Sequence, residues 1–208
     1  MKIRTRAVAM AAAAGLAAAP MMAGTAQAAP GTTSLGDVLL ADTVEGAPSF
    51  DNNGGDFDIL TAAVLGVLES NESSSVGLLL DGNVTLTAFI PTDKAFERTA
   101  GDLGITAKNE ANLTGKLVDT LGIATIEEVL LYHVVPGAKI NAKAASQADG
   151  AKLSMANGQT VKVNVTKDGI LLKDKARDVQ NPKVIVTNIN QGNKQIAHAI
   201  NRVLLPNL

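Results

Sequence analysis

The side chains that most often carry acid–base chemistry or bind transition metals are scarce in this sequence. It contains two histidines, His133 and His198, one tyrosine and no cysteine. Tyr132 stands directly before His133, so other parts of the chain would have to supply the partners of any acid–base pair. A zinc site needs a third protein ligand, and no further His or Cys is present to provide it. We therefore predict no metal and no cofactor, and a hydrolase would rest on the two histidines alone.

The acidic residues show no arrangement of the kind that catalysis requires. Glu127 and Glu128 are adjacent in a predicted helix and point to different faces, so they cannot form a paired acid and base. Asp93 follows Thr92 after an apolar run, which is the pattern of a helix start, where a carboxylate is favourable beside free N–H groups. The sequence also lacks the G-x-S-x-G motif of serine hydrolases and the GxxxxGK[ST] phosphate loop. We expect no catalytic residue and no enzyme activity.

The stretch from Asp51 to Asp56 resembles a calcium-binding loop in composition only. Read as an EF-hand, it has Gly55 at the fifth position, Asp56 where the glycine belongs and Ala62 in place of the final glutamate. Asp, Asn and Gly are also the residues that most often build turns. We interpret the stretch as a plain loop without a metal.

The Tyr-His pair falls in the stretch 125–137, which has the pattern of a buried helix. Thr125 and Glu128 have the spacing of a capping box, and Pro136 cannot continue a helix. Apolar residues occur on almost all sides between these signals, as in helices that are buried all round. His198 falls in the last predicted strand. Buried polar side chains need partners, so we interpret both histidines as residues that lock the helix to the sheet, with a contact site for a partner as the alternative.

Helical patterns dominate the first half of the chain and strand patterns the second. Helices are predicted from Asp58 and Asp93, and a third, ending at Gly122, has apolar residues at helical spacing. Asn157-Gly158 and Asp168-Gly169 predict two hairpin turns. This order predicts an α+β fold rather than alternating βαβ units. Strands are predicted at 84–90, 153–155, 161–165, 170–172, 184–186 and 197–205.

The first 28 residues have the features of a secretory signal peptide. A basic start with Lys2, Arg4 and Arg6 precedes an apolar run that is too short to span a membrane, and a small-x-small cleavage signal ends at Ala28. The alanine-rich leader is typical of high-GC bacteria. We expect cleavage after Ala28, no membrane span afterwards, and a secreted, extracellular protein that is either released or associated with the cell envelope.

The composition of residues 29–208 excludes several classes of partner. The whole chain has a net charge of −2, and removing the three basic residues of the leader gives −5. A negative chain is unsuited to nucleic acid and to anionic membranes. Four Phe, one Tyr and no Trp provide few aromatic platforms for sugars or unpaired bases. We divide the remaining chain into an N-terminal extension or loop, residues 29–55, and one domain, residues 56–208.

Three segments of that domain resemble the signatures of the fasciclin (FAS1) family in the expected order. Residues 87–96, TAFIPTDKAF, are similar to the first signature. Residues 130–137, LLYHVVPG, are similar to the Tyr-His segment, and residues 196–206, IAHAINRVLLP, to the last signature. Asn201 stands where the family usually has an aspartate.

The resemblance implies a β-wedge or sandwich of about seven strands with several helices packed on it. It further implies an extracellular interaction module of the kind associated with cell adhesion. We expect a monomer without enzyme activity that contacts an unknown protein or cell-surface partner. In animal members the Tyr-His segment is linked to integrin binding, so only Tyr132, His133 and their apolar neighbours carry over as a candidate contact, without a named partner. Thr92, Asp93 and His198 of the other two motifs are candidates for a contact or a structural role. The apolar, aromatic-poor core leaves open an extracellular carrier of a small apolar ligand.

Overall fold

The computed structural model of the protein describes residues 29–176 and 179–207. The signal peptide predicted for residues 1–28 lies outside this part of the chain. Most strands belong to two sheets, and the central one has the order β4-β3-β9-β8. It comprises β3 (Leu86–Pro91), β4 (Val134–Pro136), β8 (Val184–Ile189) and β9 (Gln195–Ile200).

The second sheet is an antiparallel meander in the order β5-β6-β7. It contains β5 (Lys152–Ser154), β6 (Thr160–Thr166) and β7 (Gly169–Lys173), and a separate two-stranded ribbon pairs β1 (Thr43–Val44) with β2 (Ala47–Pro48). The hairpin predicted at Asp168-Gly169 does join β6 to β7, but its turn lies one residue earlier, at Lys167-Asp168, and Gly169 starts β7. Seven strands in two sheets with helices packed on them confirm the predicted α+β sandwich.

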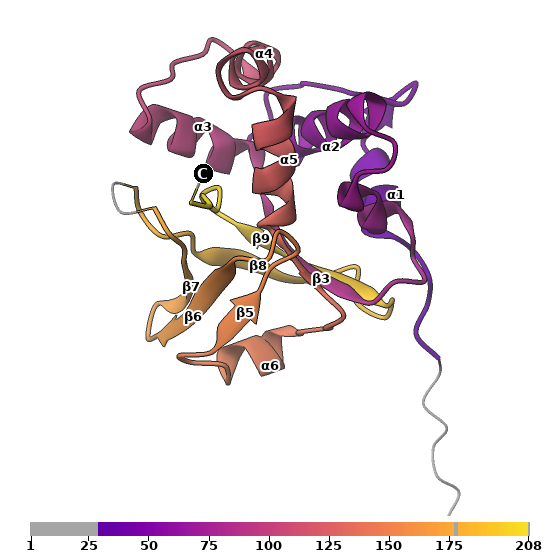
Figure 1. The fold of residues 1–208 in the computed structure, drawn as a ribbon, viewed down its shortest axis with the longest axis vertical. Helices are drawn as coiled ribbons and strands as arrows, with labels where there is room; N and C mark the ends of the chain where they lie inside the picture. Colours follow the sequence, from indigo (N-terminus) through magenta and orange to yellow (C-terminus); the bar gives the residue numbers. More distant parts are fainter. Residues whose placement is uncertain (1–28, 177–178, 208) are drawn as a thin grey trace, which may run out of the picture.

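Helices α1 to α5 lie on one side of the central sheet, and the second sheet lies on the other (Figure 1). Helices α2, α3, α4 and α5 gather above the sheet, whereas β5 to β7 lie below it with α6. The helices are α1 (Leu35–Leu40), α2 (Asp58–Ser70), α3 (Asp93–Asp102), α4 (Glu110–Leu121), α5 (Ile123–Leu131) and α6 (Ala142–Ser146), with a 3-10 helix, η1 (Ser75–Leu80).

Alternation along the central strands divides the interior into two cores. In β3, Leu86, Ala88 and Ile90 pack against the helices, whereas Phe89 packs against the second sheet. Successive side chains of a strand point to opposite faces, and both faces of β3 and β9 are covered, so every residue of these two strands is buried. The two strands are parallel neighbours, with Leu86 opposite Gln195 and Pro91 opposite Ile200.

The structure corrects the prediction of one helix through the Tyr-His segment. Helix α5 starts after Gly122, ends at Leu131 and has no side-chain cap at its start, so Thr125 and Glu128 form no capping box. Val134–Pro136 is a strand that pairs with β3. A run that is apolar on all sides fits a buried strand as well as a buried helix, and the edge of β3 offers main-chain partners that a longer helix could not use.

Residues 29–55, expected to be an extension or loop, contain α1 and the β1–β2 ribbon. Leu35 and Leu39 of α1 are buried in the helical core. The Leu35 N–H donates to the side-chain oxygen of Gln195 in β9 over 2.7 Å. This segment is therefore integrated with the domain that follows it. The last predicted strand is also shorter than expected, because β9 ends at Ile200 while Val203 and Leu204 remain buried without regular structure.

Candidate functional site

His133 lies just beyond the end of α5 and is 4% exposed. Its Nδ1 is 2.6 Å from the carbonyl oxygen of Val129, and its Nε2 accepts the N–H of Leu204 over 2.9 Å. These two contacts fix the tautomer, with the proton on Nδ1. Burial lowers the pKa of His133 to about 4, and a second proton on Nε2 would face the Leu204 N–H. His133 is thus a neutral link between α5 and the C-terminal segment.

Tyr132 is fully buried and points into the other core, between the two sheets. Its hydroxyl donates to the carbonyl oxygen of Thr160 at the start of β6, over 3.1 Å. Burial raises the pKa of the phenol to about 12. The two neighbouring side chains therefore reach in different directions, and together they connect α5 to the second sheet and to the end of the chain.

His198 lies in β9 and is 1% exposed. Its Nε2 is 2.7 Å from the carbonyl oxygen of Ile140, and its Nδ1 accepts the N–H of Asn188 in β8 over 3.4 Å. Its ring stacks on Phe89, with the ring centroids 5.9 Å apart. Burial also lowers the pKa of His198. His198 and His133 share no hydrogen-bond partner, so the structure does not bring the two histidines together as an acid–base pair.

Thr92 and Asp93 form the start of α3, but their side chains act on different helices. Thr92 is the N-cap of α3, and its hydroxyl accepts the N–H of Ala95. The Asp93 carboxylate instead accepts the N–H groups of Asp58 and Ile59, at 3.0 and 2.9 Å. These belong to the first turn of α2, so Asp93 caps a neighbouring helix rather than its own. Phe57, and not Asp58, is the N-cap residue of α2.

Five carboxylates gather where α2, α3 and α4 begin. We call Asp51, Asp56, Asp58, Asp93 and Glu110 the acidic cluster. One carboxylate oxygen from each of Asp51, Asp58 and Glu110 lies within 4.8 Å of the other two, and the same holds for Asp56, Asp58 and Asp93. The loop that the sequence analysis interpreted as plain thus lies against acidic residues from distant parts of the chain.

One inner member of the acidic cluster has a strongly shifted pKa. Burial raises the pKa of Asp93 to about 8, and the adjacent Asp56 carboxyl contributes to this rise. Burial also raises the pKa of Glu110.

The three signature segments meet in the central sheet. The Tyr-His segment supplies β4, which pairs with β3 of the first signature, and the last signature supplies β9 on the other side of β3. The last signature also contains Leu204, whose N–H donates to Nε2 of His133. A sequence profile of the Fasciclin domain family matches residues 62–206. The chain belongs to the fasciclin domain family.

Fasciclin domains are generally non-catalytic and associated with cell adhesion. A solved structure of a FAS1 domain pair from the insect cell adhesion molecule fasciclin I is similar, with a TM-score of 0.43 and 16% identity over 73% of this chain. The chain covers 45% of that structure. No curated protein matches the sequence.

Two residues that the sequence analysis did not single out are central to this fasciclin domain. Gln195 is fully buried in β9, and besides the Leu35 contact its amide donates to the carbonyl oxygens of Leu78 and Asp81, at 2.8 Å each. The sequence signal that could have identified Gln195 was its position as a polar residue at the edge of an apolar strand pattern. Glu110 is 1% exposed in the first turn of α4, and only the fold reveals its place in the acidic cluster.

Asn201, which stands where the family usually has an aspartate, makes a hydrogen bond through its side chain. Its side-chain oxygen accepts the N–H of Lys183 over 2.8 Å. An aspartate has an oxygen of the same reach, so either residue can hold this link between β9 and the segment before β8. The departure from the usual fasciclin signature therefore leaves the architecture intact.

Proposed function

We propose that this fasciclin domain is a secreted, bacterial, non-catalytic module that binds a protein or cell-surface partner outside the cell. The observation that carries the proposal is the use of Tyr132, His133 and His198 as internal links. Each of these side chains is buried and hydrogen-bonded to the main chain. Groups held in this way cannot exchange protons with a substrate, which supports binding rather than catalysis.

The proposed location outside the cell rests on the leader-like sequence of residues 1–28. In residues 29–176 and 179–207, no helix has the length and apolar character that a bilayer crossing demands. Culture medium, cell wall and membrane fractions should be separated and the protein located by antibody and by mass. We expect a chain starting at Ala29 in the medium or on the wall; an uncleaved chain confined to the cytoplasm would contradict the proposed export.

The burial of the Tyr-His pair bears on where a partner could bind. Tyr132 and His133 expose almost no surface to solvent, so we propose that they support the framework and that contacts fall on other residues. The tagged protein should be used to capture components of envelope extracts and to test adsorption to isolated walls. Recovery of one saturable partner is expected, and no adsorption to any envelope component would count against adhesion.

His133→Ala provides the control for the role of the Tyr-His segment. If the segment is structural, the variant melts at a lower temperature and, below that temperature, captures the same partner. A variant with unchanged melting that no longer captures the partner would show that the segment is itself the contact surface.

A carrier of a small apolar ligand is the second candidate, because an apolar cavity lies between α2, α3, α4 and α5. Its volume is about 70 Å³. An apolar cavity of about 150 Å³ holds benzene, so a larger ligand would require the helices to separate. Native mass spectrometry of the protein from its own host distinguishes the candidates: a retained small molecule supports the carrier, and a bare mass supports adhesion. The lining includes Ile59, Phe96, Leu117, Leu121, Leu130 and Val203.

A further inference from the structure

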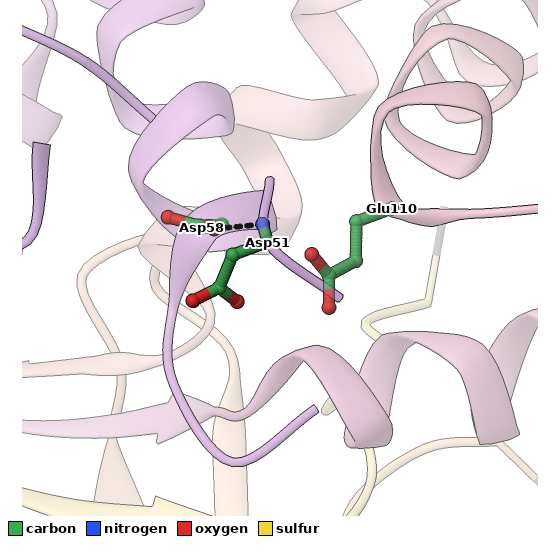
Figure 2. A group of neighbouring side chains, drawn as sticks. All are labelled: Asp51, Asp58 and Glu110. Carbon is green, nitrogen blue, oxygen red and sulfur yellow. Dashed lines mark hydrogen bonds between the residues drawn. The ribbon is translucent and has the colours of Figure 1, made fainter. Parts of the chain in front are cut away.

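The loop before α2 is folded around the carboxylate of Asp58. Asp58 is 3% exposed and accepts the main-chain N–H and the hydroxyl of Ser49, at 3.2 and 3.0 Å. It also accepts the N–H of Asp51 over 3.4 Å, the contact drawn in Figure 2. The next residue, Asn52, donates its N–H to Oε2 of Glu110 over 2.8 Å. The loop thus brings Asp51 between two buried carboxylates.

Glu110 reaches this point from a different helix. Figure 2 shows its side chain extending from the start of α4 toward the loop that carries Asp51. Glu110 is 1% exposed, and its Oε1 is buried without a hydrogen-bond partner. Burying a carboxylate oxygen without a partner costs desolvation free energy. A ligand from outside the protein would offset this cost.

No basic side chain neutralises these three carboxylates within the described ranges. The ion pairs found there join Lys94 to Glu97 and Arg202 to Asp102. Asp51, Asp58 and Glu110 therefore combine three acidic groups and an orphan oxygen in one place. Buried charge of one sign is compensated in proteins by pairing or by a bound metal ion.

We propose that Asp51, Asp58 and Glu110 bind a calcium ion that ties the loop before α2 to the start of α4. The neighbouring group of Asp56, Asp58 and Asp93 is less suited, because none of its members is exposed, which leaves less room for the waters of a calcium shell. The site goes beyond the proposed adhesion and does not depend on it.

The chemistry of the three proposed ligand side chains determines which class of metal ion can bind. All three side chains offer hard oxygen atoms, which suit calcium and magnesium rather than zinc or copper. Calcium binds oxygens at about 2.3–2.6 Å, so two of its ligands lie at most about 5 Å apart. The separations within 4.8 Å fit this limit. Asp51 is exposed, which leaves room for the waters that complete a coordination shell of about six to eight oxygens.

Calcium favours such a site over magnesium because its coordination geometry is flexible, whereas magnesium requires a nearly ideal octahedron. A site that combines a loop residue with two residues from helix starts is irregular. Extracellular modules with sites of this kind bind calcium with a Kd of about 0.1–1 mM, which matches a protein that works outside the cell.

The experiment is a titration of the purified, chelator-treated full chain with calcium chloride. Isothermal calorimetry and thermal melting are measured at constant ionic strength, with magnesium and sodium chloride in parallel. We expect saturable binding with a Kd of about 0.1–1 mM and a matching rise in Tm. Glu110→Gln and Asp51→Asn should each weaken binding at least about tenfold.

Two controls separate a specific site from general effects of charge. Glu69→Gln removes an exposed carboxylate of the same type near the far end of α2 and should leave binding unchanged. Asp51→Asn alters an exposed loop residue and keeps the test decisive if Glu110→Gln folds poorly. An unchanged Tm and no heat of binding at about 10 mM calcium would overturn the proposal. Calcium binding by Glu110→Gln and Asp51→Asn as tight as that of the wild type would also overturn it. An equal response to magnesium would overturn the assignment of calcium.

Discussion

Replacing His133 by alanine tests how the Tyr-His segment stabilises the protein. The change removes the acceptor of the Leu204 N–H, which is fully buried. An orphaned buried donor costs about 1–3 kcal/mol. We therefore expect His133→Ala to lower the free energy of unfolding at pH 7 by about 1–3 kcal/mol.

The loss of unfolding free energy caused by His133→Ala should depend on pH, because His133 is buried and neutral in the folded protein. The pKa of His133 falls from the ordinary 6.5 to about 4 in the folded protein. Between these values the unfolded chain binds the proton more readily, so wild-type stability declines as pH falls through this window and is unaffected above it. The full shift corresponds to about 3 kcal/mol. At pH 4.5, therefore, most of the advantage of wild type over His133→Ala should be gone.

Equilibrium urea unfolding of both proteins between pH 4.5 and 7.5 measures this difference. The fluorescence of Tyr132 is a convenient signal because the chain has no tryptophan and no second tyrosine. Other titrating groups, including His198, are present in both proteins and largely cancel in the comparison. A stability difference that stays constant across this range would refute the neutral, Leu204-bonded histidine, and a negligible difference at pH 7 would refute its structural role.

Three further substitutions test other links in the fold. Tyr132→Phe removes the hydrogen bond to Thr160 and should cost about 0.5–1.5 kcal/mol in thermal melting followed by circular dichroism; no change would mean that the hydroxyl is satisfied elsewhere. Gln195→Ala leaves the Leu35 N–H and two carbonyl groups without their partner. We therefore expect the free energy of unfolding to fall by at least about 2 kcal/mol and hydrogen exchange in α1 to become faster. Unchanged exchange would show that α1 is held by apolar contacts alone. A Cβ at Gly82 would lie 1.6 Å from the carbonyl oxygen of Thr32, so Gly82→Ala should displace that segment and cost about 1–3 kcal/mol. The control is Gly101→Ala at an exposed position near the end of α3, where the new Cβ meets no atom within 4 Å.

The sequence predicted the layers of this domain well because its periodicities are strong. The alternation in β3, the Gly122 that ends α4 and the hairpin between β6 and β7 depend on local chemistry, and each occurs within two residues of where it was expected. The boundary of α5 was missed because a doubly buried strand and a buried helix have the same apolar composition. Local sequence cannot reveal that β3 has a free edge to receive Val134–Pro136.

The acidic cluster shows a different limit of sequence reasoning. Asp51 and Glu110 are far apart in the chain, and neither belongs to a recognised motif. Their proximity follows from the way in which α2 and α4 pack, which is a property of the whole fold. Likewise, Asp93 was correctly placed at a helix start, but the helix that it caps is a neighbour that only the tertiary structure identifies.

The parallel pairing of β3 with β9 has a consequence for biosynthesis. The strand that completes both cores, β9, is made after the other strands of the two sheets, and it pairs with a strand about a hundred residues earlier in the chain. Contacts this distant in sequence form slowly. A nascent chain that has reached only β7 lacks the central neighbour of β3, so neither core can close around it. The topology itself thus delays the folding of the domain until its last strand, β9, has been made.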